Sequence, residues 1–138
     1  MSAPPERLRL VRQWVEKAEE DLKAAERLLP LEEDFSSVIS FHAQQCAEKF
    51  IKALLVERGI PFPRIHDIGD LIQLLPAEIR PSIDVMMQER LTHYATVSRY
   101  PGDVVISRED LEAAVAAARK VREAVLNSLP KAVVQDLL

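Results

Sequence analysis

Features of disulfide-linked, β-rich and membrane-spanning proteins are nearly absent from this sequence. Its 138 residues include one cysteine, three glycines and 5% aromatic residues. The lone Cys46 cannot form a disulfide within the chain, which suits a reducing compartment. No stretch approaches the roughly 20 apolar residues of a membrane-spanning helix, and the N-terminal MSAPPERLRL lacks the apolar core of a secretion signal. We therefore expect a cytoplasmic protein with no membrane partner.

A surplus of basic residues is also missing. The chain has 18 lysines and arginines against 22 aspartates and glutamates, a net charge of −4. Because a broad phosphate-binding face normally leaves a basic excess, this balance disfavours a long RNA-binding surface but permits a small cluster of basic side chains. The sequence has no glycine-rich phosphate loop, no His-Glu-x-x-His motif and no cysteine cluster for zinc. We therefore expect no cofactor and no metal.

Helix-forming residues dominate what is present. Apolar residues recur at i, i+3 and i+4, and prolines or Gly59 end the runs. The pattern predicts four long helices at about 7–29, 34–58, 82–97 and 107–129 and a short one at about 67–75. Asp67 and Ser107 are expected N-caps. The predicted fold is all-α, an antiparallel up-and-down helical bundle. We expect a single domain over 1–138, with its core at about 7–129 and frayed termini.

The stretch FHAQQCAEKFIKALL, residues 41–55, is apolar nearly all round, which predicts a helix central in the bundle or shared with a partner subunit. At about 100° per residue, His42, Gln45 and Lys49 lie within about 60° of one another on a largely apolar side. A buried polar group without a partner costs about 1–3 kcal/mol. Candidate partners for these side chains are His66, Asp67, Tyr94, Arg99 and Tyr100. Two interpretations stay open: satisfied core or interface polar residues, or a polar pocket for a ligand or phosphate.

Three segments together resemble the HEPN domain family (higher eukaryotes and prokaryotes nucleotide-binding). They are FHAQQCAEKFIKALL, GIPFPRIHDIGDLIQLL and, before an alanine-rich last helix, YATVSRYP. The resemblance extends from about Trp14 to Leu129. It implies a small helical bundle that commonly dimerises, and hence a homodimer. Family members include ribonuclease toxins paired with minimal nucleotidyltransferase antitoxins, nuclease domains of defence systems, and non-catalytic nucleotide- or RNA-binding versions.

The ribonucleases of this family use an arginine that is followed, after four to six residues, by a histidine. No arginine precedes His42, His66 or His93 at that spacing, and no histidine follows Arg99. We therefore predict no catalytic residues. If cleavage is retained, Arg99 and His66 are the candidates.

The resemblance and the polar residues together predict a non-catalytic module that interacts with a nucleotide or RNA, beside a separately encoded nucleotidyltransferase-type protein. In this prediction Arg99 holds phosphate, Lys49 adds charge and the histidines orient the ligand. The predicted ligand-binding residues are Arg99, Tyr100, His66, His42, Gln45 and Lys49. Two alternatives stay open: a metal-independent, toxin-like ribonuclease with a displaced histidine, and a purely structural protein-interaction module.

Overall fold

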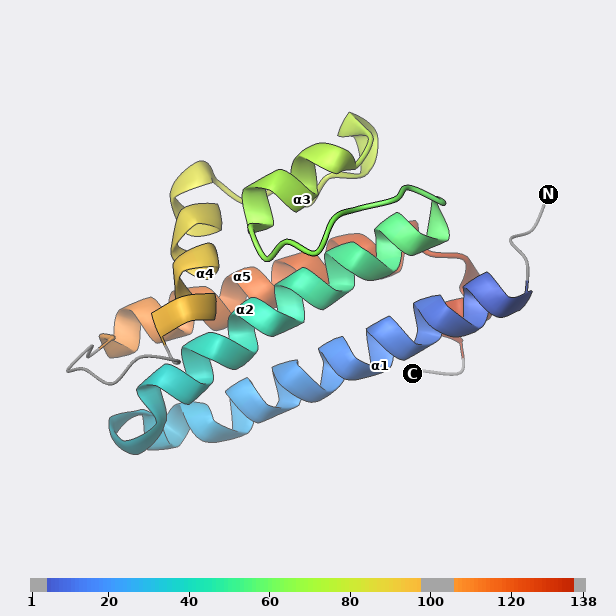
Figure 1. Ribbon diagram of the computed structural model, residues 1–138. Coiled ribbons are helices and arrows are strands. Elements are labelled where there is room, and N and C mark those ends of the chain that lie inside the picture. Colours follow the sequence, from blue (N-terminus) through green and yellow to red (C-terminus); the bar gives the residue numbers. More distant parts are fainter. Residues whose placement is uncertain (1–4, 98–105, 136–138) are drawn as a thin grey trace.

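A computed structural model describes residues 5–97 and 106–135, and the regular elements in these ranges are all helical (Figure 1). In chain order they are α1 Pro5–Leu28, the 3-10 turn η1 Leu29–Leu31, α2 Glu32–Glu57, α3 Ile68–Leu74, the 3-10 turn η2 Ala77–Ile79, α4 Val85–Val97, α5 Arg108–Ser128 and α6 Lys131–Val134. The predicted all-α bundle of four long helices and a short one is confirmed, with the four-residue α6 added after the last long helix. No helix in the described ranges is long and apolar enough to cross a membrane.

Several predicted helix ends are confirmed by local hydrogen bonds. Asp67 Oδ1 accepts from the backbone N–H three residues on at 2.8 Å, and Ser107 Oγ does the same at 3.1 Å. After α2, Gly59 has a φ of +68°, and the N–H of Ile60 donates to the carbonyl of Leu55 at 2.9 Å. A left-handed residue closes a helix in this way, and glycine adopts that conformation without a steric penalty.

Two helices start at other positions than the pattern predicts. α2 begins two residues before Asp34, because η1 leads straight into it, and Phe35 marks a kink with φ −130° and ψ 25°. α4 begins three residues after Ser82. Asp84 Oδ1 accepts from the N–H of Met87 at 2.7 Å, so the aspartate acts as the N-cap and sets this start.

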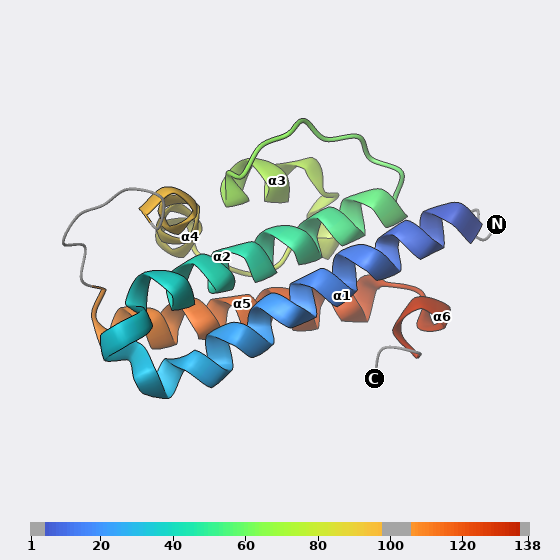
Figure 2. The same ribbon diagram turned by 60° about the horizontal axis from the view of Figure 1, so that its bottom comes forward.

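α2 lies in the middle of the molecule. α1 and α5 run alongside it, whereas α3 and α4 lie on the side of α2 away from α1, and α4 runs across the long helices (Figures 1 and 2). α2 contacts all four of these helices. It is therefore buried nearly all round, in agreement with its apolar pattern. Its buried apolar residues are Ile39, Ala43, Cys46, Ala47, Phe50, Ile51, Ala53, Leu54 and Leu55.

The two long neighbours of α2 each bury one face. In α1 the buried apolar positions are Val11, Val15, Ala18, Leu22 and Ala25. In α5 they are Leu111, Ala114, Val115, Ala117, Ala118, Val121 and Val125. The small alanines leave room for close approach of α5 to α2. α6 packs back on this core through the buried Val133, and Arg12 of α1 donates to the carbonyl of Ala132 at 3.1 Å.

Candidate functional site

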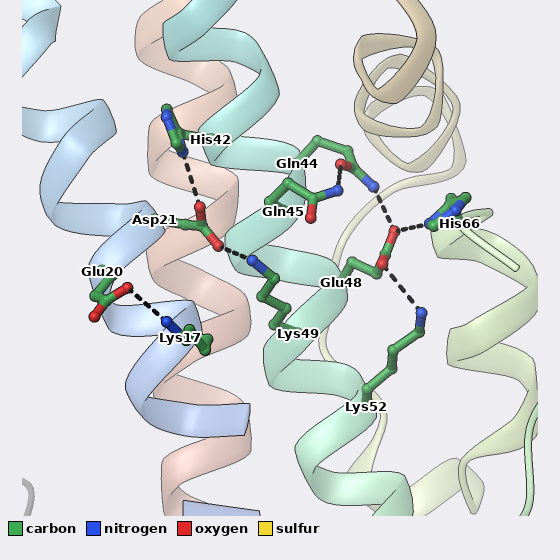
Figure 3. Close-up of polar contacts among 10 residues, drawn as sticks. All are labelled: Lys17, Glu20, Asp21, His42, Gln44, Gln45, Glu48, Lys49, Lys52 and His66. Carbon is green, nitrogen blue, oxygen red and sulfur yellow. Dashed lines mark hydrogen bonds and ion pairs between the residues drawn. The ribbon is translucent and has the colours of Figure 1, made fainter. Parts of the chain in front are cut away.

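Polar side chains line both flanks of α2, within otherwise apolar surroundings (Figure 3). On the flank toward α1 lies the Asp21 cluster, which consists of Asp21, His42 and Lys49. On the flank toward α3 lies the Glu48 cluster, which consists of Gln44, Gln45, Glu48, Lys52 and His66. Each cluster is organised around one carboxylate.

In the Asp21 cluster a carboxylate of α1 joins two side chains of α2. His42 Nδ1 donates to Asp21 Oδ1 at 2.8 Å, and Lys49 Nζ donates to Asp21 Oδ2 at 2.7 Å. Asp21 is almost fully buried, whereas the side chains of His42 and Lys49 remain 29% and 23% exposed. The cluster therefore reaches solvent through its histidine and its lysine.

In the Glu48 cluster the carboxylate accepts three hydrogen bonds. Glu48 Oε1 accepts from Gln44 Nε2 at 2.9 Å and from His66 Nδ1 at 2.9 Å, while Oε2 accepts from Lys52 Nζ at 3.1 Å. Gln45 Nε2 donates to Gln44 Oε1 at 2.7 Å. Glu48 is buried, and the side chain of His66 is 53% exposed, so this cluster reaches solvent through its histidine.

The Glu48 cluster also holds the segment between α2 and α3 against the bundle. The Lys52 ammonium lies 5.7 Å from the ring centre of Trp14 in α1 and 5.6 Å from that of Phe62 in the connection. Both distances suit cation–π contacts. His66 adds a second attachment at the end of the same connection. The side chain of His66 is thus attached to α2.

The predicted site residues divide into two groups. The structure brings His42 and Lys49 together in the Asp21 cluster, and Gln45 and His66 into the Glu48 cluster. The other two, Arg99 and Tyr100, lie outside the described residues. His42, Gln45 and Lys49 are all hydrogen-bonded within the fold, which agrees with the interpretation of satisfied polar residues.

Of the hydrogen-bond partners predicted for α2, two have other roles. Asp67 caps α3, where the backbone N–H groups of the first turn need an acceptor. Tyr94 is buried in the core, and its burial, together with the negative charge of Asp110, raises the pKa of its phenol. His66 does bind α2, but through Glu48 rather than through His42, Gln45 or Lys49.

Sequence reasoning missed Asp21, Gln44 and Glu48, although the sequence contains a signal for each. Asp21 lies three residues after Ala18 and four before Ala25, within the apolar stripe of α1. Gln44, Glu48 and Lys52 follow one another at i, i+4 spacing on a helix that is otherwise apolar. A charged residue inside an apolar stripe requires a buried partner.

The geometry indicates which chemistry these side chains can and cannot perform. A histidine held at Nδ1 by a carboxylate keeps its Nε2 for a ligand or a proton. Cys46, in contrast, is not suited to act as a nucleophile, because burial and the nearby charge of Asp21 raise the pKa of its thiol well above the ordinary value. Among the described residues, no three His, Cys, Asp or Glu side chains are arranged to hold a metal ion.

Comparison with known proteins assigns the chain to a family. The family model of the HEPN domain matches residues 11–129. The crystal structure of ST0689, an archaeal HEPN homologue, is 28% identical, with a TM-score of 0.68 over 86% of this chain and 96% of that one. The crystal structure of TT1696 from Thermus thermophilus is also 28% identical, with a TM-score of 0.69 over 86% of this chain and 98% of that one.

A curated relative is similar over a shorter stretch. "Putative toxin MJ1304" of Methanocaldococcus jannaschii is 45% identical over 51 residues, which make up 37% of this chain and 32% of that protein. The match therefore covers about a third of the relative's length. The family match spans most of the chain, from α1 to the end of α5. This protein belongs to the HEPN domain family.

Proposed function

We propose that this HEPN protein binds a nucleotide or a short stretch of RNA without cleaving it, and works with a separately encoded nucleotidyltransferase-type protein. The observation that carries the proposal is the state of two histidines. His42 and His66 are each held at Nδ1 by a buried carboxylate, and neither has an arginine at the spacing of the family's ribonucleases. Such rings can form hydrogen bonds to a ligand through Nε2, but the arginine that completes the cleavage motif is missing.

The charges of the two clusters favour a small ligand over a long nucleic acid. Lys49 is paired with Asp21 and Lys52 with Glu48, so neither cluster has a net positive charge while its imidazole is neutral. Long RNA is bound mainly through many uncompensated basic side chains. Hydrogen bonds from a few fixed side chains suit a nucleotide or a short RNA segment better. Arg99 and Tyr100 stay in the proposal as the residues that contact phosphate.

The proposed protein partner is supported by the relative from M. jannaschii. Its name describes a toxin, and the family includes ribonuclease toxins that are paired with minimal nucleotidyltransferase antitoxins. We include a homodimer in the proposal, because dimers are common in the family. Light scattering of the purified protein, alone and with the candidate nucleotidyltransferase, tests both associations.

The main experiment measures cleavage and binding on the same samples. Labelled RNA is incubated with the protein in EDTA, and the melting temperature is recorded with AMP, ATP and the same RNA. We expect intact RNA and a rise in melting temperature that grows with ligand concentration. Lys49→Gln should reduce the rise, whereas the matched variant Lys120→Gln, on the exposed side of α5, should not. Intact RNA without any rise would contradict binding and favour a purely structural module.

A metal-independent ribonuclease is the second candidate, and the His42–Asp21 contact of 2.8 Å favours it. An imidazole that donates a hydrogen bond to a carboxylate can act as a general base. The ammonium of Lys49, which is bound to the same carboxylate, can stabilise negative charge that develops on the phosphate. Cleavage in EDTA that is lost in His42→Ala, His66→Ala or Arg99→Ala, but retained in Lys120→Gln, would replace our proposal with this one.

A further inference from the structure

A hollow of about 520 Å³ lies between the start of α3 and one side of α4. The helices that line it, α3 and α4, lie on the side of α2 away from α1 (Figure 2), whereas Asp21 belongs to α1. Its main lining residues are Asp67 and Gly69 at the start of α3 and Val85, Gln88, Glu89 and His93 of α4. Neither polar cluster of α2 contributes to this lining.

The walls of the hollow are tied together before any ligand binds. Thr92 Oγ1 accepts a hydrogen bond from the backbone N–H of Ile68 at 2.9 Å and donates to the carbonyl of Gln88 at 2.8 Å. The start of α3 is thus attached to the middle of α4. A preformed hollow of this kind loses little conformational freedom when a partner binds.

An exposed apolar pair adjoins the hollow. Val85 and Met86 begin α4 and are 67% and 63% exposed, more than any other large apolar side chain in the described ranges. Val85 also lines the hollow. Single exposed apolar residues are common on protein surfaces, but two neighbours beside a preformed hollow offer an anchor point for a partner.

The charge around this surface is negative. Residues 67–97 contain two arginines and five carboxylates, namely Asp67, Asp70, Glu78, Asp84 and Glu89. Both arginines already interact with other groups of the chain. Arg80 donates to the carbonyls of Leu75 and Gln73 at 2.9 and 3.2 Å, and Arg90 lies 3.5 Å from Asp110. Glu89 forms no hydrogen bond or ion pair with the part of the chain that the structure describes. Phosphate groups are repelled by such a surface, and basic side chains are attracted.

We propose that the hollow and the Val85–Met86 pair form a docking surface for a basic, amphipathic segment of a partner protein. An arginine or lysine of that segment enters the hollow and pairs with Glu89 and the free oxygen of Asp67. An apolar side chain of the segment, one helical turn away, covers Val85 and Met86. Amphipathic helices bind in grooves with anchors at this spacing, and charge-assisted bonds to carboxylates fix their register. Of the described residues in the nucleotide proposal, none lines the hollow, although His66 directly precedes Asp67, and the docking inference does not depend on nucleotide binding.

The test uses a short fluorescent peptide with leucines and arginines one helical turn apart. Two further peptides carry glutamate for arginine or serine for leucine. Fluorescence anisotropy should detect binding of the leucine–arginine peptide and no binding of the other two peptides. Glu89→Lys should weaken this binding by about tenfold or more, because one charge-assisted contact is lost. The same variant should bind the glutamate peptide, which the unmodified protein does not bind. Val85→Ser should weaken the binding of the leucine–arginine peptide.

The matched variants are Glu16→Lys and Leu10→Ser, which change an exposed carboxylate and an exposed leucine of α1. Both should bind the peptide as the unmodified protein does. Equal losses of peptide affinity in Glu89→Lys and Glu16→Lys would show that only the net charge of the protein matters, and would overturn the proposal. Absence of peptide binding would also overturn it, as would displacement of the peptide by RNA. Circular dichroism confirms that each variant is folded.

Discussion

At the scale of single residues, two buried carboxylates organise the polar groups of α2. Asp21 holds a histidine and a lysine, and Glu48 holds a glutamine, a histidine and a lysine. A buried ion pair adds little stability compared with an apolar pair of the same shape, but removal of one partner leaves an uncompensated charge in the core. The clusters therefore matter more for the placement of side chains than for net stability.

Glu48→Ala should lower the free energy of unfolding by about 3–5 kcal/mol, because it leaves the Lys52 ammonium buried without a counter-charge. Urea unfolding followed by circular dichroism measures the change. Glu48→Leu combined with Lys52→Met should cost clearly less than Glu48→Ala alone. For comparison, Glu20→Ala, which removes an exposed partner of Lys17, should cost no more than about 1 kcal/mol. Equal losses for Glu48→Ala and Glu20→Ala would contradict the structural role of the Glu48 cluster.

Cys46 should react slowly with thiol reagents in the folded protein, even at mildly alkaline pH. Burial and the charge of Asp21 raise its pKa in the folded state well above 9.0, so the reactive thiolate is scarce. Because the folded state favours the neutral thiol, this group's contribution to stability is complete below pH 9 and declines as the pH rises toward the higher folded-state pKa. Dithionitrobenzoate kinetics with and without urea measure the difference. A fast reaction without urea would show that the thiol is accessible.

At the scale of elements, helix ends follow from local chemistry, and the exceptions have local causes as well. Asp67 and Gly59 act as the sequence predicts, because a cap bond or a left-handed residue involves only neighbours in the chain. The start of α4 was predicted at Ser82 but is set by Asp84. Both residues are good N-caps, so the pattern alone did not distinguish them.

Gly59→Ala should destabilise the protein by about 1–2 kcal/mol, the cost of a left-handed conformation for a residue with a Cβ. The new Cβ would also lie 3.3 Å from Nη1 of Arg7, although this flexible side chain can move. Thermal and urea unfolding measure the change. Gly59→Asn should cost less, because asparagine tolerates this conformation better than alanine does. Alanine and asparagine variants of equal stability would show that backbone strain is not the cause.

At the scale of the whole molecule, α2 separates two surfaces with different chemistry. The flank toward α1 presents His42 and Lys49 (Figure 3), and the layer of α3 and α4 presents an acidic hollow with an exposed apolar pair. Because α2 is packed against helices on both sides, each surface has its own support. In our proposals, Lys49 takes part in nucleotide binding on the first surface, and Glu89 takes part in peptide binding on the second.

Substitutions on the two surfaces should act independently. Lys49→Gln should weaken nucleotide or RNA binding and leave peptide binding unchanged. Glu89→Lys should weaken peptide binding and leave nucleotide or RNA binding unchanged. In the double variant, the loss of binding free energy for each ligand should equal the sum of the losses in the two single variants, since substitutions at distant sites without shared partners are additive within about 0.5 kcal/mol. Anisotropy with both labelled ligands on all four proteins measures this. Loss of both activities in either single variant would indicate one shared site.

The sequence by itself determined the helices, most of their ends and the central place of α2, because apolar periodicity and caps depend on residues close together in the chain. It also identified His42, Gln45 and Lys49 as polar residues that needed partners, and His66 as one of several candidate partners. Only the tertiary structure decided which partners they have. Asp21 lies 21 residues before His42, and Glu48 lies 18 residues before His66. Such pairs form only when particular helix faces meet, and those faces are selected by packing of the whole bundle.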